Sequence, residues 1–332
     1  MNEPKSEPNP EPTFSSLTPD LVLSAVEGHL GAFLDGSITP YNSYVNRVFG
    51  IADEDGNHYI VKFYRPGRWS DEAIAEEHAF LADCAEAEVP VVPPIPAKDG
   101  ATLARAEGFR FAVFPRVRAR TFDIAGDEDW LRIGRAVGRL HRAGSVRAAP
   151  SRLRLTPEDT TARYLARFAQ DGLVHPDCRA EFSSCCAEAL GIIESRFAEL
   201  AQKPAHRIHG DLHRGNILEN GALTILDFDD MMTGPAVQDL WLLLPGHRAE
   251  STKEINLLLE GYEEFSEFDR ASLGLIEPLR FMRHVYFLAW CAIQRRDEGF
   301  AGRFPGWGER AFWIAETEDL LTQLGFLRAE RG

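Results

Sequence analysis

The 332-residue chain has few cysteines, no long apolar run and no excess of basic residues. Its five cysteines are odd in number and lack the spacing of metal ligands, so we expect reduced thiols in a cytoplasmic protein. No apolar run reaches the ~20 residues that a membrane-spanning helix needs. The acidic, proline-rich start is also unlike a signal peptide, and we expect no membrane partner.

The formal net charge is -15, which argues against nucleic acid as a partner because phosphate backbones are bound by basic surfaces. An acidic protein attracts cationic substrates or basic peptides, although acidity also serves solubility alone. The length allows one large or two medium domains, and the apolar and charged fractions are those of an ordinary globular protein. We expect it to act as a monomer.

Composition divides the chain into three parts. Residues 1–14 carry repeated Glu-Pro and Asn-Pro steps and predict a disordered tail. Residues 15–115 predict a strand-rich lobe that also contains two helices, capped by Thr18 and Ser70. Residues 116–332 read as mainly helical. Within them we expect the acidic run 260–269 to lie on a helix and the apolar-rich helical region 273–293 to break near Pro278. The expected strands of the first lobe are 45–51, 59–64 and 109–113.

One stretch carries the chemistry. The pattern His-Gly-Asp-x-x-x-x-Asn occupies residues 209–216, and two short strands around the turn Asn220-Gly221 follow it and end at an acidic residue. Such a hairpin brings Asp211, Asn216 and Asp227 to one edge. Hard oxygen donors suit Mg²⁺, which predicts Asn216 and Asp227 as metal ligands. Asp211 can accept a proton from a hydroxyl, and this set suits phosphoryl transfer. The alternative is a surface hairpin with incidental acids.

This stretch resembles the catalytic loop and metal-binding Asp of the protein-kinase-like superfamily, in the form found in its aminoglycoside phosphotransferase and choline kinase branch. The resemblance implies a bilobal α+β fold, with ATP and Mg²⁺ bound between a strand-rich and a helical lobe. The lobes would meet near residue 116. Catalytic roles would then fall to Asp211 and Asp227.

The resemblance also implies a lysine that holds the nucleotide phosphates and pairs with a helical glutamate. Lys62 lies inside an apolar strand and is the candidate, although strand alternation alone would allow a solvent-facing lysine. The helix that begins near Ser70 offers three glutamates. We expect Glu77 to be the partner because it lies on the apolar stripe of that helix, whereas Glu76 points roughly opposite.

Kinase-like folds place a glycine-rich loop before the lysine strand, but residues 41–47 contain no glycine. Side chains must then contact the phosphates, and Ser43 and Asn42 can donate hydrogen bonds to them. An ordinary turn hydroxyl is the alternative for Ser43. The missing glycines also leave open a catalytically silent nucleotide-binding module.

Other polar residues are given structural roles. We expect His141 to pack in the core, and the resemblance gives Asp239 the role of binding the backbone of the catalytic loop. The histidines His206, His209 and His213 could indicate zinc, but no cysteine or carboxylate completes a ligand set at the required spacing.

The acceptor is harder to predict. No arginine precedes Asp211, and only a short segment separates Asp230 from Pro235, which leaves no long activation loop. These features favour a small-molecule phosphotransferase that acts on choline, homoserine or an aminoglycoside.

A closer resemblance favours proteins as acceptors. Four stretches are similar to the bacterial stress response kinase A family: 42–48, 61–66, 234–241 and 262–269. This resemblance implies a cytoplasmic Ser/Thr protein kinase of stress survival, with protein Ser/Thr substrates. It gives Asp211 the role of proton acceptor, makes Asn216 and Asp227 the magnesium ligands, and places Ser43 against ATP.

Overall fold

The computed structural model describes residues 13–200, 205–297 and 299–329. Contacts within the chain define two compact units. Unit 1 runs to Asp123 and includes Arg214–Asp229, and unit 2 contains Ile124–His213 and the chain from Asp230 onward. The sequence-based boundary at residue 116 stays a prediction, and the predicted disordered tail lies almost entirely outside the described residues.

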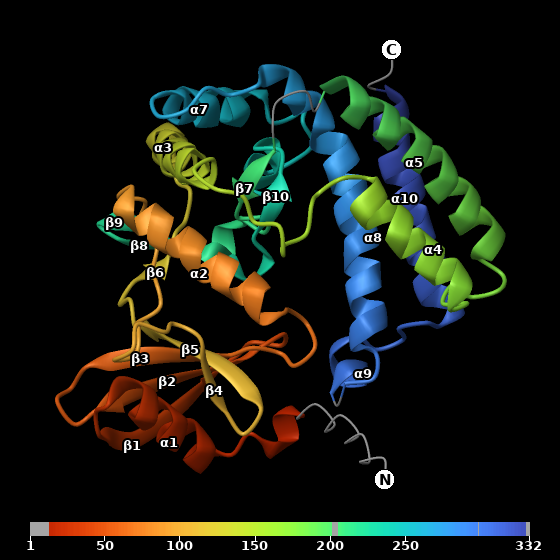
Figure 1. The fold of residues 1–332 in the computed structure, drawn as a ribbon. Coiled ribbons are helices and arrows are strands. Elements are labelled where there is room, and N and C mark those ends of the chain that lie inside the picture. The colour runs from red at the N-terminus through yellow and green to blue at the C-terminus, as the bar shows by residue number, and fades with distance from the viewer. Residues whose placement is uncertain (1–12, 201–204, 298, 330–332) are drawn as a thin grey trace, which may run out of the picture. The chain divides into compact units, whose positions relative to one another are not determined.

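Unit 1 is built on a five-stranded antiparallel sheet with the strand order β1-β2-β3-β5-β4 (Figure 1). Strands rich in β-branched and aromatic residues form its centre, as the sequence pattern predicts. The strands are β1 (Leu34–Tyr41), β2 (Arg47–Asp53), β3 (His58–Phe63), β4 (Ala104–Ala106) and β5 (Phe109–Pro115).

Two helices cover this sheet, α1 (Pro19–Leu30) and α2 (Asp71–Glu86). Both begin where predicted, because Thr18 and Ser70 accept hydrogen bonds from the backbone of the first turn. Apolar residues of α1 share a core with Val61 and Phe63 of β3. Successive side chains of a strand point to opposite faces, so Lys62 points away from this core.

The predicted hairpin after the catalytic loop is confirmed. Strands β8 (Ile217–Asn220) and β9 (Ala222–Ile225) pair antiparallel, and the short strand β6 (Arg120–Thr121) pairs with β8. Gly221 occupies the turn with a φ of 73°, a conformation that glycine adopts without steric cost. A short 3-10 turn, Arg214–Asn216, leads into β8.

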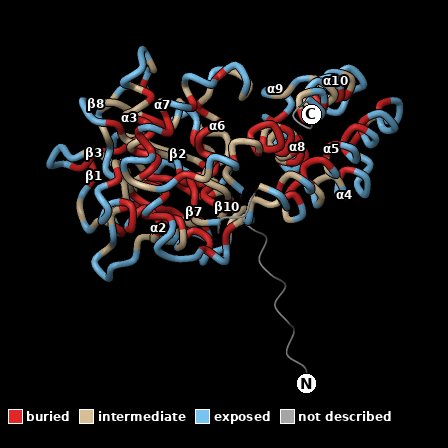
Figure 2. The backbone as a smooth tube through the Cα atoms, turned by 90° about the horizontal axis from the view of Figure 1, so that it is seen from above, coloured by how far each residue is buried: buried red, intermediate tan, exposed pale blue. Residues whose placement is uncertain are grey.

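Unit 2 is mainly helical, with one two-stranded sheet formed by β7 (His206–Ile208) and β10 (Met232–Gly234). Figure 2 shows that most of α8 is buried. The glycines of α3 allow α7 to approach closely, since a Cβ at Gly138 would lie 2.5 Å from the Tyr262 carbonyl oxygen. The helices are α3 (Asp127–Gly144), α4 (Arg163–Gln170), α5 (Arg179–Leu200), α6 (Val237–Trp241), α7 (Thr252–Glu263), α8 (Ile276–Gln294), α9 (Phe300–Arg303) and α10 (Arg310–Ala329).

Two sequence-based expectations for unit 2 are wrong. The helical region 273–293 was expected to break near Pro278, but α8 is continuous and Pro278 lies in its first turn. A proline is tolerated there because the N–H groups of a first turn have no partner within the helix. The acidic run 260–269 is only partly helical, since α7 ends at Glu263. No helix in the described part of the chain combines the length and apolarity needed to cross a bilayer.

Candidate active site

Lys62 lies at the centre of a buried charge cluster in unit 1. Its Nζ is 3.2 Å from Glu77 Oε1 and 2.9 Å from Asp229 Oδ1. Glu77 is buried on α2, whereas Glu72, on the first turn of the same helix, is exposed. The predicted pairing of Lys62 with Glu77 is confirmed, and the role of both residues in nucleotide binding stays a prediction.

The charge of Lys62 depends on these neighbours. Burial by itself lowers the pKa of a lysine, but the carboxylates of Asp229 and Glu77 hold the pKa of Lys62 well above its usual value. The ammonium therefore stays charged at neutral pH although the side chain is buried. A buried, oriented cation of this kind can hold an anionic group such as a phosphate.

Asp229 and Arg68 are members of this cluster that the sequence reasoning missed. Asp229 is buried and contacts both Lys62 and the Arg68 guanidinium. Asp229 follows Asp227 by two residues, and this proximity was the only signal in the sequence. Nothing in the pattern around Arg68 indicated that it pairs with a residue so distant in the chain.

Asp227 and Asn216 lie at one end of the β8–β9 hairpin. The Leu226 N–H donates to the Asn216 carbonyl oxygen at 2.9 Å, which ties the residue before Asp227 to Asn216. Asp227 has a φ of 61°, a left-handed backbone conformation that is costly for a non-glycine residue and is concentrated at functional sites. Its side chain is 59% exposed, with Oδ1 3.7 Å from Lys62 Nζ. An accessible carboxylate and a side-chain amide are donors that fit Mg²⁺, although the metal role of both residues stays a prediction.

Ser43 lies in the glycine-free loop between β1 and β2. Two side chains hold this loop in shape. Asn46 Oδ1 accepts the Arg65 N–H at 3.0 Å, and the Arg65 guanidinium donates to two loop carbonyls at 2.8 Å. Arginine and asparagine side chains thus fix a loop that lacks glycine, and the contact of Ser43 with a phosphate stays a prediction.

The first part of the catalytic-loop motif, residues 209–213, belongs to unit 2, and Asp239 holds its backbone. Asp239 is fully buried and accepts the His209 N–H at 2.7 Å and the Gly210 N–H at 2.8 Å. His141 Nε2 lies 3.0 Å from Asp239 Oδ2. Burial raises the pKa of Asp239, but these partners outweigh it and lower the pKa below 3.8. The predicted roles of Asp239 and His141 are confirmed.

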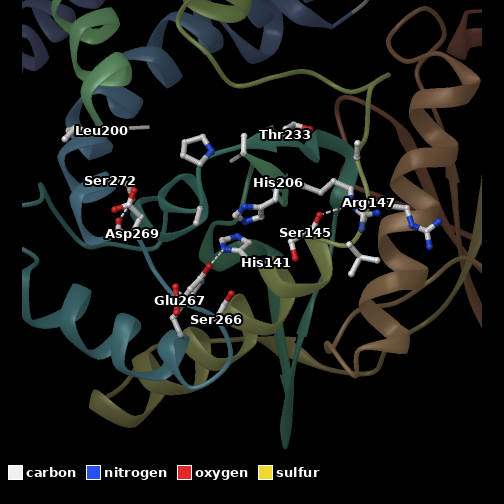
Figure 3. A pocket seen from close by; sticks show the side chains of 18 residues that line it. His141, Ser145, Arg147, Leu200, His206, Thr233, Ser266, Glu267, Asp269 and Ser272 are labelled. Atoms are coloured by element: carbon white, nitrogen blue, oxygen red, sulfur yellow. Dashed lines mark hydrogen bonds between the residues drawn. The ribbon is translucent and has the colours of Figure 1, made fainter. Parts of the chain in front are cut away.

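Figure 3 shows His141 and His206 side by side in a cavity of about 600 Å³ within unit 2. Their ring centroids are 5.0 Å apart, and His141 Nδ1 lies 3.0 Å from the Tyr262 hydroxyl. His141 therefore connects the wall of this cavity to Asp239 and, through it, to the catalytic loop.

Gly210 explains why no arginine precedes Asp211. Its φ is 83°, and a Cβ at this position would lie 2.3 Å from the Asp230 carbonyl oxygen. Gln238 also donates to the Gly210 carbonyl oxygen at 3.0 Å. Any side chain at position 210 would therefore displace the backbone at Asp230.

Asp211 is largely buried and is paired with an arginine that the sequence reasoning missed. Arg283 of α8 places Nη2 2.6 Å from Asp211 Oδ1. Burial raises the pKa of Asp211 and the charge of Asp230 raises it further, while Arg283 and the histidines His213 and His209 lower it; the net direction is upward. The helical period of α8 did not identify Arg283, because one charged residue on a long helix has many explanations.

Comparison with known proteins supplies the family. The model of the phosphotransferase enzyme family matches residues 37–276. Stress response kinase A of Escherichia coli (strain K12) is 39% identical over 316 residues, which cover 95% of each chain. Serine/threonine protein kinase RdoA of Salmonella typhimurium (strain LT2) is 39% identical over 323 residues, again 95% of each chain.

Solved structures agree on the fold. An amicoumacin kinase aligns with a TM-score of 0.69 at 19% identity, covering 91% of this chain and 92% of the other. A spectinomycin phosphotransferase aligns with a TM-score of 0.66 at 14% identity, covering 94% and 98%. The predicted α+β, protein-kinase-like fold of the aminoglycoside phosphotransferase and choline kinase branch is confirmed. The chain belongs to the phosphotransferase enzyme family and, within it, to the stress response kinase A family.

Proposed function

We propose that this protein is an ATP-dependent Ser/Thr protein kinase of a bacterial stress response. It would transfer the γ-phosphate of Mg-ATP to protein Ser and Thr hydroxyls, including its own as possible acceptors. The observation that carries this proposal is the 39% identity, over 95% of both chains, to relatives named as a stress response kinase and a Ser/Thr protein kinase. The proposal includes a cytoplasmic location and a monomeric state.

ATP is the proposed phosphate donor. The amicoumacin kinase was solved with AMP-PNP and Ca²⁺, and the spectinomycin phosphotransferase with ADP, so both proteins of this fold bind an adenine nucleotide, the first of them together with a divalent cation. In this chain the charged, buried Lys62 is suited to bind the phosphates, and Glu77 holds it in place.

Asn216 and Asp227 would hold Mg²⁺. This ion usually takes only one or two protein ligands and completes its shell with water and phosphate oxygens, which an exposed Asp227 permits. When bound, the ion neutralises charge on the phosphate oxygens. The chain itself would supply orientation, through Lys62 on the phosphates and Asp211 on the acceptor hydroxyl.

Asp211 would orient the acceptor hydroxyl and take its proton late in the transfer. Burial raises its pKa above the usual value of 3.8, which makes the carboxylate a better base than an exposed aspartate. Arg283 holds one carboxylate oxygen and limits this rise.

The alternative acceptor is a small molecule such as an aminoglycoside, choline or homoserine. The amicoumacin and spectinomycin enzymes share the fold, but they are only 19% and 14% identical to this chain. At such low identity, a shared fold does not indicate a shared acceptor. The Arg283 cation beside Asp211 argues against polycationic acceptors, because like charges at a few ångströms repel.

An acceptor panel tests the proposal. Purified protein with Mg-ATP is offered a generic basic protein, a Ser-containing peptide library and, separately, aminoglycosides, choline and homoserine, with ADP release as the readout. We expect ADP release above the background rate with protein or peptide only. Turnover with a small alcohol and none with protein would assign the chain to the small-molecule branch. Nucleotide binding with no turnover on any acceptor would indicate a silent binding module.

A further inference from the structure

An exposed stripe on α8 begins beside the proposed catalytic aspartate. It consists of Arg283, Phe287, Trp290 and Ile293, and we call it the α8 stripe. Spacings of four and three residues place these side chains on one side of the helix. Phe287 is 39% exposed and Ile293 is 54% exposed, although most of α8 is buried. Neighbouring apolar groups left exposed in this way mark binding surfaces more often than scattered single residues do.

The aromatic part of the stripe is ordered. The rings of Phe287 and Trp290 are stacked, with centroids 6.4 Å apart and planes 15° from parallel. Phe304 packs against both rings, at 6.1 Å from Phe287 and 5.8 Å from Trp290. These contacts hold the rings in a fixed arrangement, so a partner would bind them at little cost in side-chain entropy.

Arg283 joins the stripe to the chemistry. It pairs with Asp211 at 2.6 Å, and its guanidinium lies over the Tyr286 ring at 5.4 Å from the centroid. A guanidinium has five N–H donors, and the contact with Asp211 Oδ1 uses only part of them. Because 31% of the Arg283 side chain is exposed, the guanidinium can also donate hydrogen bonds to a second carboxylate.

We propose that the α8 stripe is the docking surface for the protein acceptor, and this inference rests on the proposed kinase function. The acceptor segment would carry an acidic residue next to the phosphorylated Ser or Thr, bound by Arg283. It would also carry an apolar side chain two to five residues from that acidic residue, bound by Phe287, Trp290 and Ile293. No small alcohol has the length to reach both ends of this stripe.

The helix geometry sets that spacing. With a rise of about 1.5 Å per residue, Phe287, Trp290 and Ile293 lie roughly 6, 10 and 15 Å along the axis from Arg283. An extended peptide advances about 3.3 Å per residue. The aromatic pair is therefore reached about two to three residues from the acidic residue that Arg283 binds, and Ile293 about four to five residues from it.

The preference for an acidic neighbour runs against the net charge of -15. Exposed charges more than ~8 Å away are largely screened at physiological ionic strength, whereas a direct contact with a partly buried guanidinium is screened much less. Arg283 therefore decides which residue is accepted beside the hydroxyl. The remote acidic surface would affect the rate of encounter instead.

A peptide series tests the stripe directly. Each peptide has one Ser and an adjacent Asp or Asn. A Leu stands one to six residues from that Asp or Asn, on either side, and Gln takes the place of Leu in the reference peptide. We expect kcat/KM to rise roughly tenfold when Leu stands two to five residues away, the gain from burying one large apolar side chain. We also expect Asp to be preferred to Asn.

Variants assign these preferences to residues. Phe287→Ser with Ile293→Ser should remove the Leu preference while the Leu-free reference peptide keeps its rate. Val146→Ser is the matched control, because Val146 is 69% exposed and lies outside the stripe. Arg283→Gln should bring the Asp-to-Asn ratio of kcat/KM to about one. Arg283→Lys should keep part of the preference for Asp. A general weakening of Asp211 would lower kcat/KM for both peptides and leave their ratio unchanged.

The outcomes separate the two proposals. If the wild type labels protein but the peptide profile is flat, or the stripe variants keep the wild-type profile, the α8 stripe proposal fails and the kinase proposal stands. If the wild type labels no protein or peptide at all, both proposals fail.

Discussion

Charged groups from several elements of unit 2 act on the pKa of Asp211. Burial and Asp230 raise its pKa, while Arg283 and the neighbouring histidines lower it. Transfer requires the carboxylate form, so activity should fall as the pH drops through this raised pKa. Arg283→Gln removes a cation that favours ionisation, which should move the acid limb of the kcat profile to higher pH. A pH profile of both proteins measures this, and an unmoved limb would mean that Arg283 does not act on Asp211.

Gly210 makes a second prediction at the scale of single residues. Gly210→Ala has to place a Cβ 2.3 Å from the Asp230 carbonyl oxygen while keeping a φ of 83°. Gly172→Ala is the control, because Gly172 also has a positive φ, of 59°, but open space around it. The control should cost about 1–2 kcal/mol of unfolding free energy. Gly210→Ala should cost roughly 1–3 kcal/mol more, and equal losses in urea denaturation would contradict the close contact.

The site residues differ in how clearly the sequence pattern indicates their contacts. Lys62 was identified by the resemblance to kinase-like folds, which also implies a glutamate partner, and the apolar stripe of the helix after Ser70 then indicated Glu77. Arg283 and Asp229 were missed because their contacts join segments far apart in the chain, and a single sequence carries no record of such pairs. The sequence shows that position 210 holds glycine and that no arginine precedes Asp211. The reason, the close approach of the Asp230 carbonyl oxygen to Gly210, is apparent only in the folded chain.

Among the elements, the α3–α7 contact is the clearest test of packing. A Cβ at Gly138 would lie 2.5 Å from the Tyr262 carbonyl oxygen, so Gly138→Ala must move α7 and should cost about 1–3 kcal/mol. Gly191→Ala on α5 meets nothing within 4 Å and should instead stabilise the protein by about 0.5–1 kcal/mol. Thermal unfolding of both variants measures the difference, and shifts of the same sign would show that α3 and α7 are not tightly packed.

Element boundaries were predicted best where a local signal exists. Thr18 and Ser70 marked the starts of α1 and α2, because a capping side chain acts on the turn beside it. The break that the sequence predicts near Pro278 is wrong, because this proline lies in the first turn of α8, where it removes no hydrogen bond of the helix. A proline signals that a helix boundary is near without saying on which side it lies.

In the whole molecule, two sets of residues would have separate roles in the proposed reaction. Those of unit 1 would bind Mg-ATP, and Asp211 of unit 2 would act on the acceptor. Asp227→Asn should therefore weaken Mg-ATP binding roughly tenfold or more, while Asp211→Asn should bind Mg-ATP like the wild type. Calorimetric titration with Mg-AMP-PNP measures both constants. Normal binding by Asp227→Asn would overturn its assignment as a metal ligand.

The decisive experiment for the kinase proposal is transfer of radiolabelled γ-phosphate to a protein acceptor, by the wild type and by Asp211→Asn at equal concentration. Acid hydrolysis of the labelled protein then identifies the modified amino acid. We predict label in phosphoserine or phosphothreonine with the wild type, and a loss of roughly a hundredfold or more in the variant. Equal labelling by Asp211→Asn would rule out the catalytic role of Asp211, and label absent from protein but present in a small alcohol would rule out a protein kinase.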